Sequence, residues 1–256
     1  MNKLLFSPLF LVLYFVLAPL PQALFGTCVR AQTVTPKAAL YQTYLAGDGA
    51  SAQALVDRFV ADESVPKIQL LESYYLLLNS TMATQDKATF EANIGTAEKL
   101  AEQLAKAKGD DAPRAQGILA ALYGYKIAYA PAKGMTLGPK SKKLYAQALA
   151  ANPDEPLVLM LYGVNKYHTP AAWGGSLTEA EKSMQQALAT FSCGDDEWVH
   201  ASALAWLGMA QHDLEKQDEA LKTFELAAST HKGFNWVDKV LLPQAREIAA
   251  ERKAKG

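Results

Sequence analysis

The stretch from Gly134 to Ser141 contains the residue types of a phosphate-binding loop: two glycines, a lysine and a hydroxyl group. In a P-loop four residues separate the glycines, and the lysine directly follows the second glycine on a turn from strand to helix. Here three residues separate Gly134 from Gly138, Pro139 stands before Lys140, and a helical pattern precedes the stretch. These departures favour an ordinary turn over a nucleotide site.

Histidine and cysteine are the next candidates for chemistry. The spacings among the four histidines do not place two ligands on one helix face, and none of them stands beside a Cys or an acidic residue in a metal-binding pattern. Stacking of neighbouring helices could still bring two of them together, His168 and His212. Cys193, between Ser192 and Gly194, lacks the surroundings of an activated nucleophile. We therefore expect a non-catalytic protein without metal or cofactor.

The segment Trp173-Gly174-Gly175 precedes a capping box, Ser176-Leu177-Thr178-Glu179, at the start of a helix. One interpretation is an anion site, because paired glycines before a helix can direct backbone N–H groups at a ligand. The other is a tight turn in which the glycines serve backbone conformation and Trp173 covers the helix ends. We favour the tight turn.

The N-terminus has the layout of a secretory signal peptide. Lys3 precedes an apolar run of ten residues over 9–18, which is too short to span a bilayer, and Val29-Arg30-Ala31 resembles a cleavage site. We predict a signal peptide over 1–31 and a periplasmic or secreted mature chain. Lipid attachment at Cys28 is disfavoured, because Phe25 and Thr27 do not fit a lipobox.

The mature chain would carry 23 basic and 26 acidic residues, a net charge of −3, and one cysteine. This balance gives no sign of a nucleic-acid surface, which would show clustered positive charge. The lysine groups, such as the one at 140–143, are interpreted as solvated helix faces. One cysteine excludes an internal disulfide, so packed helices must supply the stability.

Helical spacing of apolar residues extends along the chain, and a capping residue stands shortly before Pro36, Pro66, Pro113 and Pro156. The apolar spacing and these helix-start signals predict an all-α protein. The predicted helices cover 36–46, 50–62, 66–82, 87–107, 112–130, 139–151, 155–168, 177–191, 197–214, 217–230 and 236–253.

A repeated pattern organises these helices. Gly124, Gly163 and Gly208 each lie on the first helix of a pair, and the second helix carries a small residue, then a large one, then Ala. The large residues are Tyr145, Met184 and Phe224. Glycine and small residues allow two helices to approach closely, and stacked pairs bury a continuous core.

This pattern resembles the tetratricopeptide repeat family through Leu204, Leu207, Gly208, Ala220, Phe224 and Ala227, which lie at the spacing of the family signature. The resemblance implies a right-handed α-solenoid of about five helix pairs over 32–256. The clearest repeats are 112–153, 155–192 and 197–230, and 236–253 is a capping helix. The likeness is weaker over 66–107.

Two stretches are similar to those of secreted bacterial repeat proteins: 169–175, and 234–243 with its Phe234-Asn235-Trp236 start. The proline–aromatic–Gly-Gly turn is also similar to one in helical periplasmic subunits of TRAP-type transporters. That likeness leaves open an alternative function, a small-molecule-binding or transport-accessory subunit.

The tetratricopeptide resemblance implies a concave groove lined by the first helix of each pair, where another protein or a peptide would bind. The groove positions form an aromatic, neutral surface suited to an extended ligand. Burial between repeats is the competing interpretation for each tyrosine. The groove candidates are Tyr125, Tyr129, Tyr167, His168, Met209 and His212. The expected function is protein–protein interaction or scaffolding, with an unknown partner.

Overall fold

The computed structural model describes residues 35–107, 109–192 and 196–255, and all regular structure within these ranges is helical. The predicted signal peptide and Cys193 lie outside the described residues. The α-helices are α1 (Pro36–Ala46), α2 (Gly49–Ala61), α3 (Lys67–Thr84), α4 (Lys87–Lys106), α5 (Ala112–Tyr129), α6 (Gly134–Ala151), α7 (Pro156–His168), α8 (Leu177–Thr190), α9 (Glu197–Asp213), α10 (Gln217–Thr230) and α11 (Leu242–Lys255). The predicted all-α class is confirmed.

Capping explains several helix starts. The hydroxyl of Thr35 accepts the amide of Ala38 at 3.2 Å, directly before Pro36 in the first turn of α1. The hydroxyl of Ser176 accepts the amide of Glu179 at 3.2 Å at the start of α8. Each bond pairs one of the amides that a helix start leaves without an intrahelical partner.

One predicted boundary is wrong, and it involves proline. Helix α6 begins at Gly134, directly after the 3₁₀ turn η1 (Pro131–Lys133), and passes through Pro139. Pro139 lies on the exposed face, where the Met135 carbonyl that it leaves unpaired can be hydrated. The predicted helix over 236–253 is helical throughout, and a π-helical turn, η3 (Val237–Leu241), continues directly into α11. Pro243 follows η3, and the wider turn accommodates its missing N–H.

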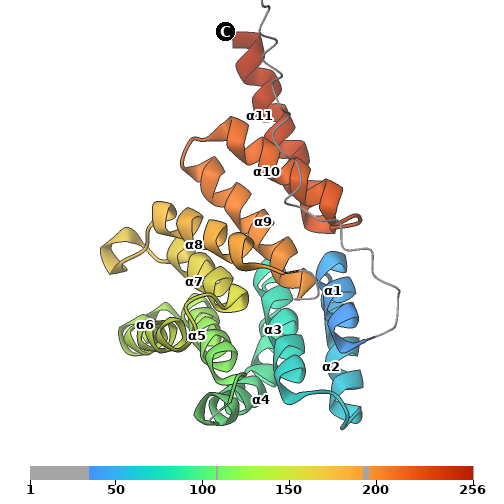
Figure 1. Ribbon diagram of the computed structural model, residues 1–256, viewed down its shortest axis with the longest axis vertical. Coiled ribbons are helices and arrows are strands. Elements are labelled where there is room, and N and C mark those ends of the chain that lie inside the picture. The colour runs from blue at the N-terminus through green and yellow to red at the C-terminus, as the bar shows by residue number, and fades with distance from the viewer. Residues whose placement is uncertain (1–34, 108, 193–195, 256) are drawn as a thin grey trace, which may run out of the picture.

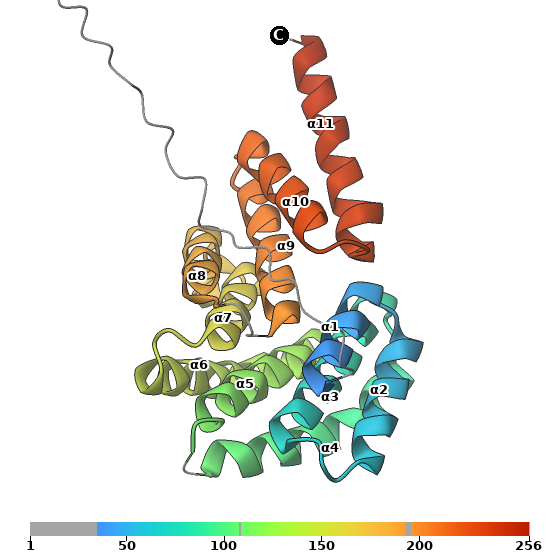
Figure 2. The same ribbon diagram turned by 45° about the vertical axis from the view of Figure 1, so that its right-hand side comes forward.

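The helices form two layers (Figures 1 and 2). Helices α3, α5, α7 and α9 contact one another in series, and α1 contacts both α3 and α9. These five, the inner helices, therefore complete a closed circuit of contacts. The outer helices α2, α4, α6, α8 and α10 pack on them. Helix α11 packs mainly on α10 and η3 and extends away from the body.

The repeat glycines behave differently from one another. A Cβ added at Gly163 would lie 2.7 Å from Met184 Cε, and one at Gly208 would lie 2.3 Å from Phe224 Cε1. Both distances match the predicted close approach between the helices of a pair. At Gly124 that prediction is wrong, because a Cβ there would meet nothing within 4 Å. On α5 the close contact is made by Gly117, towards Val158 of α7 at 3.1 Å.

Most of the buried apolar side chains form one core along the inner helices, and a second cluster joins α9, α10, η3 and α11 with Leu45 of α1. The core includes the fully buried Leu71, Ile118, Leu157 and Met160. Within the described residues no helix is both long and apolar enough to cross a lipid bilayer.

Candidate functional site

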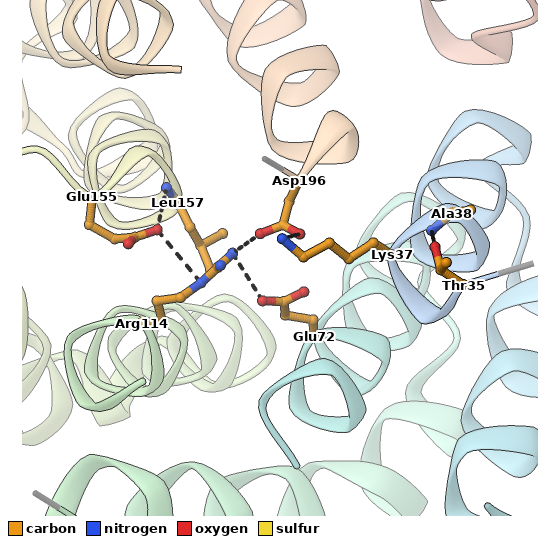
Figure 3. A network of polar contacts seen from close by, with 8 residues as sticks. All are labelled: Thr35, Lys37, Ala38, Glu72, Arg114, Glu155, Leu157 and Asp196. Carbon is orange, nitrogen blue, oxygen red and sulfur yellow. Dashed lines mark hydrogen bonds and ion pairs between the residues drawn. The ribbon is translucent and has the colours of Figure 1, made fainter. Parts of the chain in front are cut away.

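Five ionisable side chains meet near the N-terminal ends of the inner helices (Figure 3). The guanidinium of Arg114 on α5 lies 3.0 Å from Glu72 Oε1 on α3 and 3.6 Å from Glu155 Oε1 before α7. Arg114 also donates to Asp196 Oδ2, directly before α9. The other oxygen of Asp196 lies 3.2 Å from Lys37 Nζ on α1. We call these five residues the charged cluster.

The charged cluster is buried. Glu72 is 1% exposed, Asp196 4% and Arg114 16%. Burial raises the pKa of Glu72 to about 7, and Asp196 adds to the rise, while attraction to Arg114 opposes it. When Glu72 is protonated, the two cations balance the two remaining carboxylates. Buried charges in this arrangement neutralise one another, so the charged cluster joins the inner helices rather than offering a free charge to a ligand.

A second polar contact holds α1 against the end of α10. The hydroxyl of Tyr41 lies 2.9 Å from His231 Nδ1, and His231 Nε2 lies 2.7 Å from His200 Nδ1 on α9. Burial lowers the pKa of His200 to about 4. Burial and the neighbouring His200 lower the pKa of His231 to about 3. Both rings are therefore neutral at pH 7, and a hydrogen bond between two imidazoles requires one of them to accept.

Aromatic rings continue from the buried interior to the surface. Consecutive ring centroids are between 5.2 and 6.4 Å apart, from α5 through α3, α9, α1 and η3 back to α9. The rings in order are Tyr125, Tyr75, Trp198, Tyr44, Phe234, Trp236 and Trp206. These ring contacts therefore connect α3 and α9, the two inner helices that α1 contacts.

The surface end of this chain is a group of rings that we call the aromatic patch: Tyr167, His168, Trp206 and Trp236. Trp206 lies 5.3 Å from the Tyr167 ring, 5.0 Å from the His168 ring and 5.2 Å from the Trp236 ring. Tyr167, Trp206 and Trp236 are half-buried, and His168 is exposed. All four side chains therefore keep some exposure to solvent while their packing restricts their conformations.

Electrostatics keep the aromatic patch uncharged. The Tyr167 hydroxyl donates to Asp213 at the end of α9, and burial together with this carboxylate raises the pKa of the phenol. Burial of part of its ring lowers the pKa of His168. Both groups are neutral at pH 7, so the patch offers apolar ring area with hydrogen-bonding edges.

The structure separates the six groove candidates into two regions. Tyr125 donates to Asn79 and stacks on Tyr75, and Tyr129 donates to the Thr81 carbonyl and packs on Phe90, with centroids 4.2 Å apart. Both tyrosines are half-buried between α5 and its neighbours.

The other four candidates lie on α7 and α9. Tyr167 and His168 belong to the aromatic patch. Met209 packs against the second apolar cluster, and the half-buried His212 accepts from Gln217 through its backbone carbonyl at 3.0 Å. The ends of α7 and α9 meet through Tyr167 and Asp213 rather than through the two histidines.

The glycine turn after α7 has a backbone role. Gly174 adopts a φ of +92°, and a Cβ at Gly175 would lie 1.6 Å from the Thr169 carbonyl oxygen. The prediction that Trp173 covers the helix ends is wrong, since its side chain, in the short turn η2 (Ala171–Trp173), is 73% exposed. The stretch compared with a P-loop lies in α6 from Gly134 onward, so it forms no loop around a phosphate.

Trp206, Trp236 and the charged cluster were not predicted from the sequence. A signal for the cluster was present: 42 residues separate Glu72 from Arg114, and 41 separate Arg114 from Glu155 and Glu155 from Asp196. Ionisable residues at this nearly constant spacing reach equivalent ends of neighbouring inner helices. Within the described residues, no three His, Cys, Asp or Glu side chains are grouped to hold a metal ion.

Comparisons with known proteins give no family. No family model matches the chain, and no curated protein matches it. Among solved structures, the HusA haemophore from Porphyromonas gingivalis is similar at a TM-score of 0.46 and 18% sequence identity. The match covers 72% of this chain and 96% of the haemophore. A likeness at this level carries no argument about function.

Proposed function

We propose that this chain is an exported, non-catalytic interaction module of tetratricopeptide-like helix pairs arranged as an α-solenoid, and that a partner protein binds the aromatic patch. The observation that carries the proposal is the meeting of four aromatic rings from α7, α9 and the residue before η3, each of them at least partly exposed. Aromatic residues held in this way are the residue types that supply much of the energy of protein interfaces.

The surroundings of the aromatic patch support a binding role. Trp206 and Trp236 connect through Phe234 to rings in the core, so little conformational entropy would be lost when a partner packs on them. Tyr167 and His168 add hydrogen-bonding groups at the edge, where a partner could satisfy them. The contacts at Gly163 and Gly208 support the repeat interpretation, because each provides the close helix approach that the tetratricopeptide pattern implies.

The test is site-specific photocrosslinking in the native cell envelope. The photoreactive residue benzoylphenylalanine replaces His168 in the full chain, and in a matched control it replaces Lys99, an exposed residue of α4. We expect a discrete protein adduct from position 168 that is absent from position 99. The crosslinked partner should then lose affinity for a Tyr167→Ala/His168→Ala variant of unchanged helicity. Identical adducts from both positions, or none from position 168, would contradict the proposal.

A further inference from the structure

Helix α6 differs from the other outer helices because its solvent face carries no carboxylate. The stretch 112–153 contains six basic residues and no acidic ones, whereas α2, α4, α8 and α10 all contain Asp or Glu. Ser141, Tyr145 and Ala148 form the buried side of α6. The exposed side consists of Met135, Thr136, Pro139, Lys140, Lys142, Lys143, Ala146, Gln147, Ala150 and Ala151.

The lysines of this face form no ion pair with a described carboxylate. Lys140, Lys142 and Lys143 on α6, and Lys133 in η1 just before it, are all exposed. Glu179 of α8 lies 2.6 Å from Lys166 Nζ, and attraction to Lys142 also contributes to its lowered pKa. This carboxylate therefore offsets only part of the positive charge of the face.

Two large apolar side chains lie at the same edge as this positive charge. Met135, in the first turn of α6, is 78% exposed, and Trp173, in the turn after α7, is 73% exposed. Helices α5 and α7 contact each other, and Arg114 near the start of α5 reaches Glu155 at the start of α7. The two helices therefore run side by side in the same direction, which places the turns that follow them at one edge.

We propose that this edge, the α6 flank formed by Lys133, Met135, Lys140, Lys142 and Lys143 together with Trp173, binds the surface of a bilayer containing anionic phospholipids. The chemistry of a lipid surface matches both parts of the flank. Lysine ammonium groups attract lipid phosphates, and their long stems let apolar neighbours approach the boundary between headgroups and acyl chains. Trp and Met contribute the apolar contact that such a boundary accepts. The protein lies on the membrane without crossing it.

The test is co-sedimentation of the full chain with large vesicles. Vesicles of phosphatidylcholine alone are compared with vesicles of an equimolar mixture of phosphatidylcholine and phosphatidylglycerol. We expect binding only to the anionic vesicles, and we expect added salt to weaken it. The charge-reversal variant Lys140→Glu/Lys143→Glu should bind about 10-fold more weakly or worse, since each basic residue near an anionic surface contributes appreciably.

A matched control separates the α6 flank from net charge. The variant Lys222→Glu/Lys232→Glu changes the formal charge by the same amount at exposed residues on and just after α10. It should bind anionic vesicles nearly as well as the original chain. Brominated lipids should quench the fluorescence of the original chain more than that of a Trp173→Phe variant, because Trp173 would reach the lipid.

Three results would overturn the proposal. The first is equal sedimentation with neutral and anionic vesicles, or with neither. The second is an equal loss of binding in the two charge-reversal variants. The third is tight binding of soluble polyglutamate at the α6 flank without binding to anionic vesicles, which would assign the flank to an acidic polypeptide.

Discussion

Two regions of the inner helices differ in which side chains they bury. At the N-terminal ends, the charged cluster buries carboxylates and cations against one another, with Glu72 and Asp196 almost without exposure. At the C-terminal end of α7 and the neighbouring middle of α9, the aromatic patch leaves His168 exposed and Tyr167 and Trp206 half-buried. Polar groups are thus buried in one region, and aromatic rings keep partial exposure in the other.

We interpret this difference as a separation between residues that stabilise the fold and residues that bind a partner. A buried charge without its partner is costly, so the charged cluster constrains the positions of the helices that supply it. Exposed, preorganised rings cost the free protein little and gain contact area when a partner covers them. We therefore expect substitutions in the charged cluster to change stability, and substitutions in the aromatic patch to change binding.

The largest effect is expected from Arg114→Met. This change leaves Glu72 and Asp196 buried without the guanidinium, and breaking a buried ion pair by removing one partner costs about 3–5 kcal/mol. The midpoint of urea unfolding measures the loss. Lys182→Ala, at an exposed lysine of α8, should shift the midpoint very little. Similar midpoints for both variants would mean that the charged cluster does not join the inner helices.

Acidification should weaken the contact between α1 and the pair His200 and His231. The pKa values of His200 and His231 are lowered from 6.5 to about 4 and about 3. The unfolded chain therefore binds protons that the native protein excludes as pH falls below about 6.5. Their contribution to stability is complete above that pH and is lost as pH falls through the two folded-state values. Urea midpoints between pH 7 and pH 4 measure this effect.

Protonation of Glu72 changes the stability in the opposite direction, and it provides a control for the predicted effect of acidification. Its pKa is raised from 4.5 to about 7, so the native protein binds a proton there that the unfolded chain does not. This contribution is present below about pH 4.5 and is lost as pH rises through about 7. Glu72→Gln should make the loss of stability on acidification steeper, and His200→Gln/His231→Gln should make it shallower. A slope unaffected by the histidine changes would contradict the prediction.

A smaller effect on stability is expected on the helix that carries Trp206. In Gly208→Ala the new Cβ would lie 2.3 Å from Phe224 Cε1, so the Phe224 ring or the two helices must shift. Overpacking of this kind costs about 1–3 kcal/mol. Gly124→Ala is the matched control, because its Cβ meets nothing within 4 Å and the better helix propensity of alanine gains up to about 1 kcal/mol. Thermal melting should move in opposite directions for the two variants.

The smallest effect on stability is expected at the aromatic patch itself. Tyr167→Ala removes a half-buried ring and an exposed hydrogen bond to Asp213, so the melting temperature should change little. Affinity for the crosslinked partner should fall by about 2 kcal/mol or more. Tyr129→Ala is the contrasting variant, because it removes the contacts with Phe90 and Thr81 and should lower the melting temperature. A selective loss of binding in Tyr129→Ala alone would move the site to α5.

Much of the fold was predictable because its signals are local. The spacing of apolar residues and the caps at Thr35 and Ser176 depend on neighbours within a few residues, and these predictions agree with the observed helix starts. The boundary at Pro139 was wrong because the surroundings of a proline, rather than its presence, decide whether a helix continues. The open space at Gly124 likewise depends on side chains from outside its own helix.

The sequence by itself determined the helical class, the order of the helices and the repeat period, since each follows from residue types at short and regular spacing. Only the tertiary structure decided that α1 contacts α9, that Tyr41 reaches His231 across 190 residues, and that Trp206 meets Trp236 while Tyr129 packs on Phe90. The physical reason is that these contacts join helices that lie far apart in the chain. The packing of those helices on one another, which no single segment encodes, decides which distant side chains become buried partners and which remain accessible.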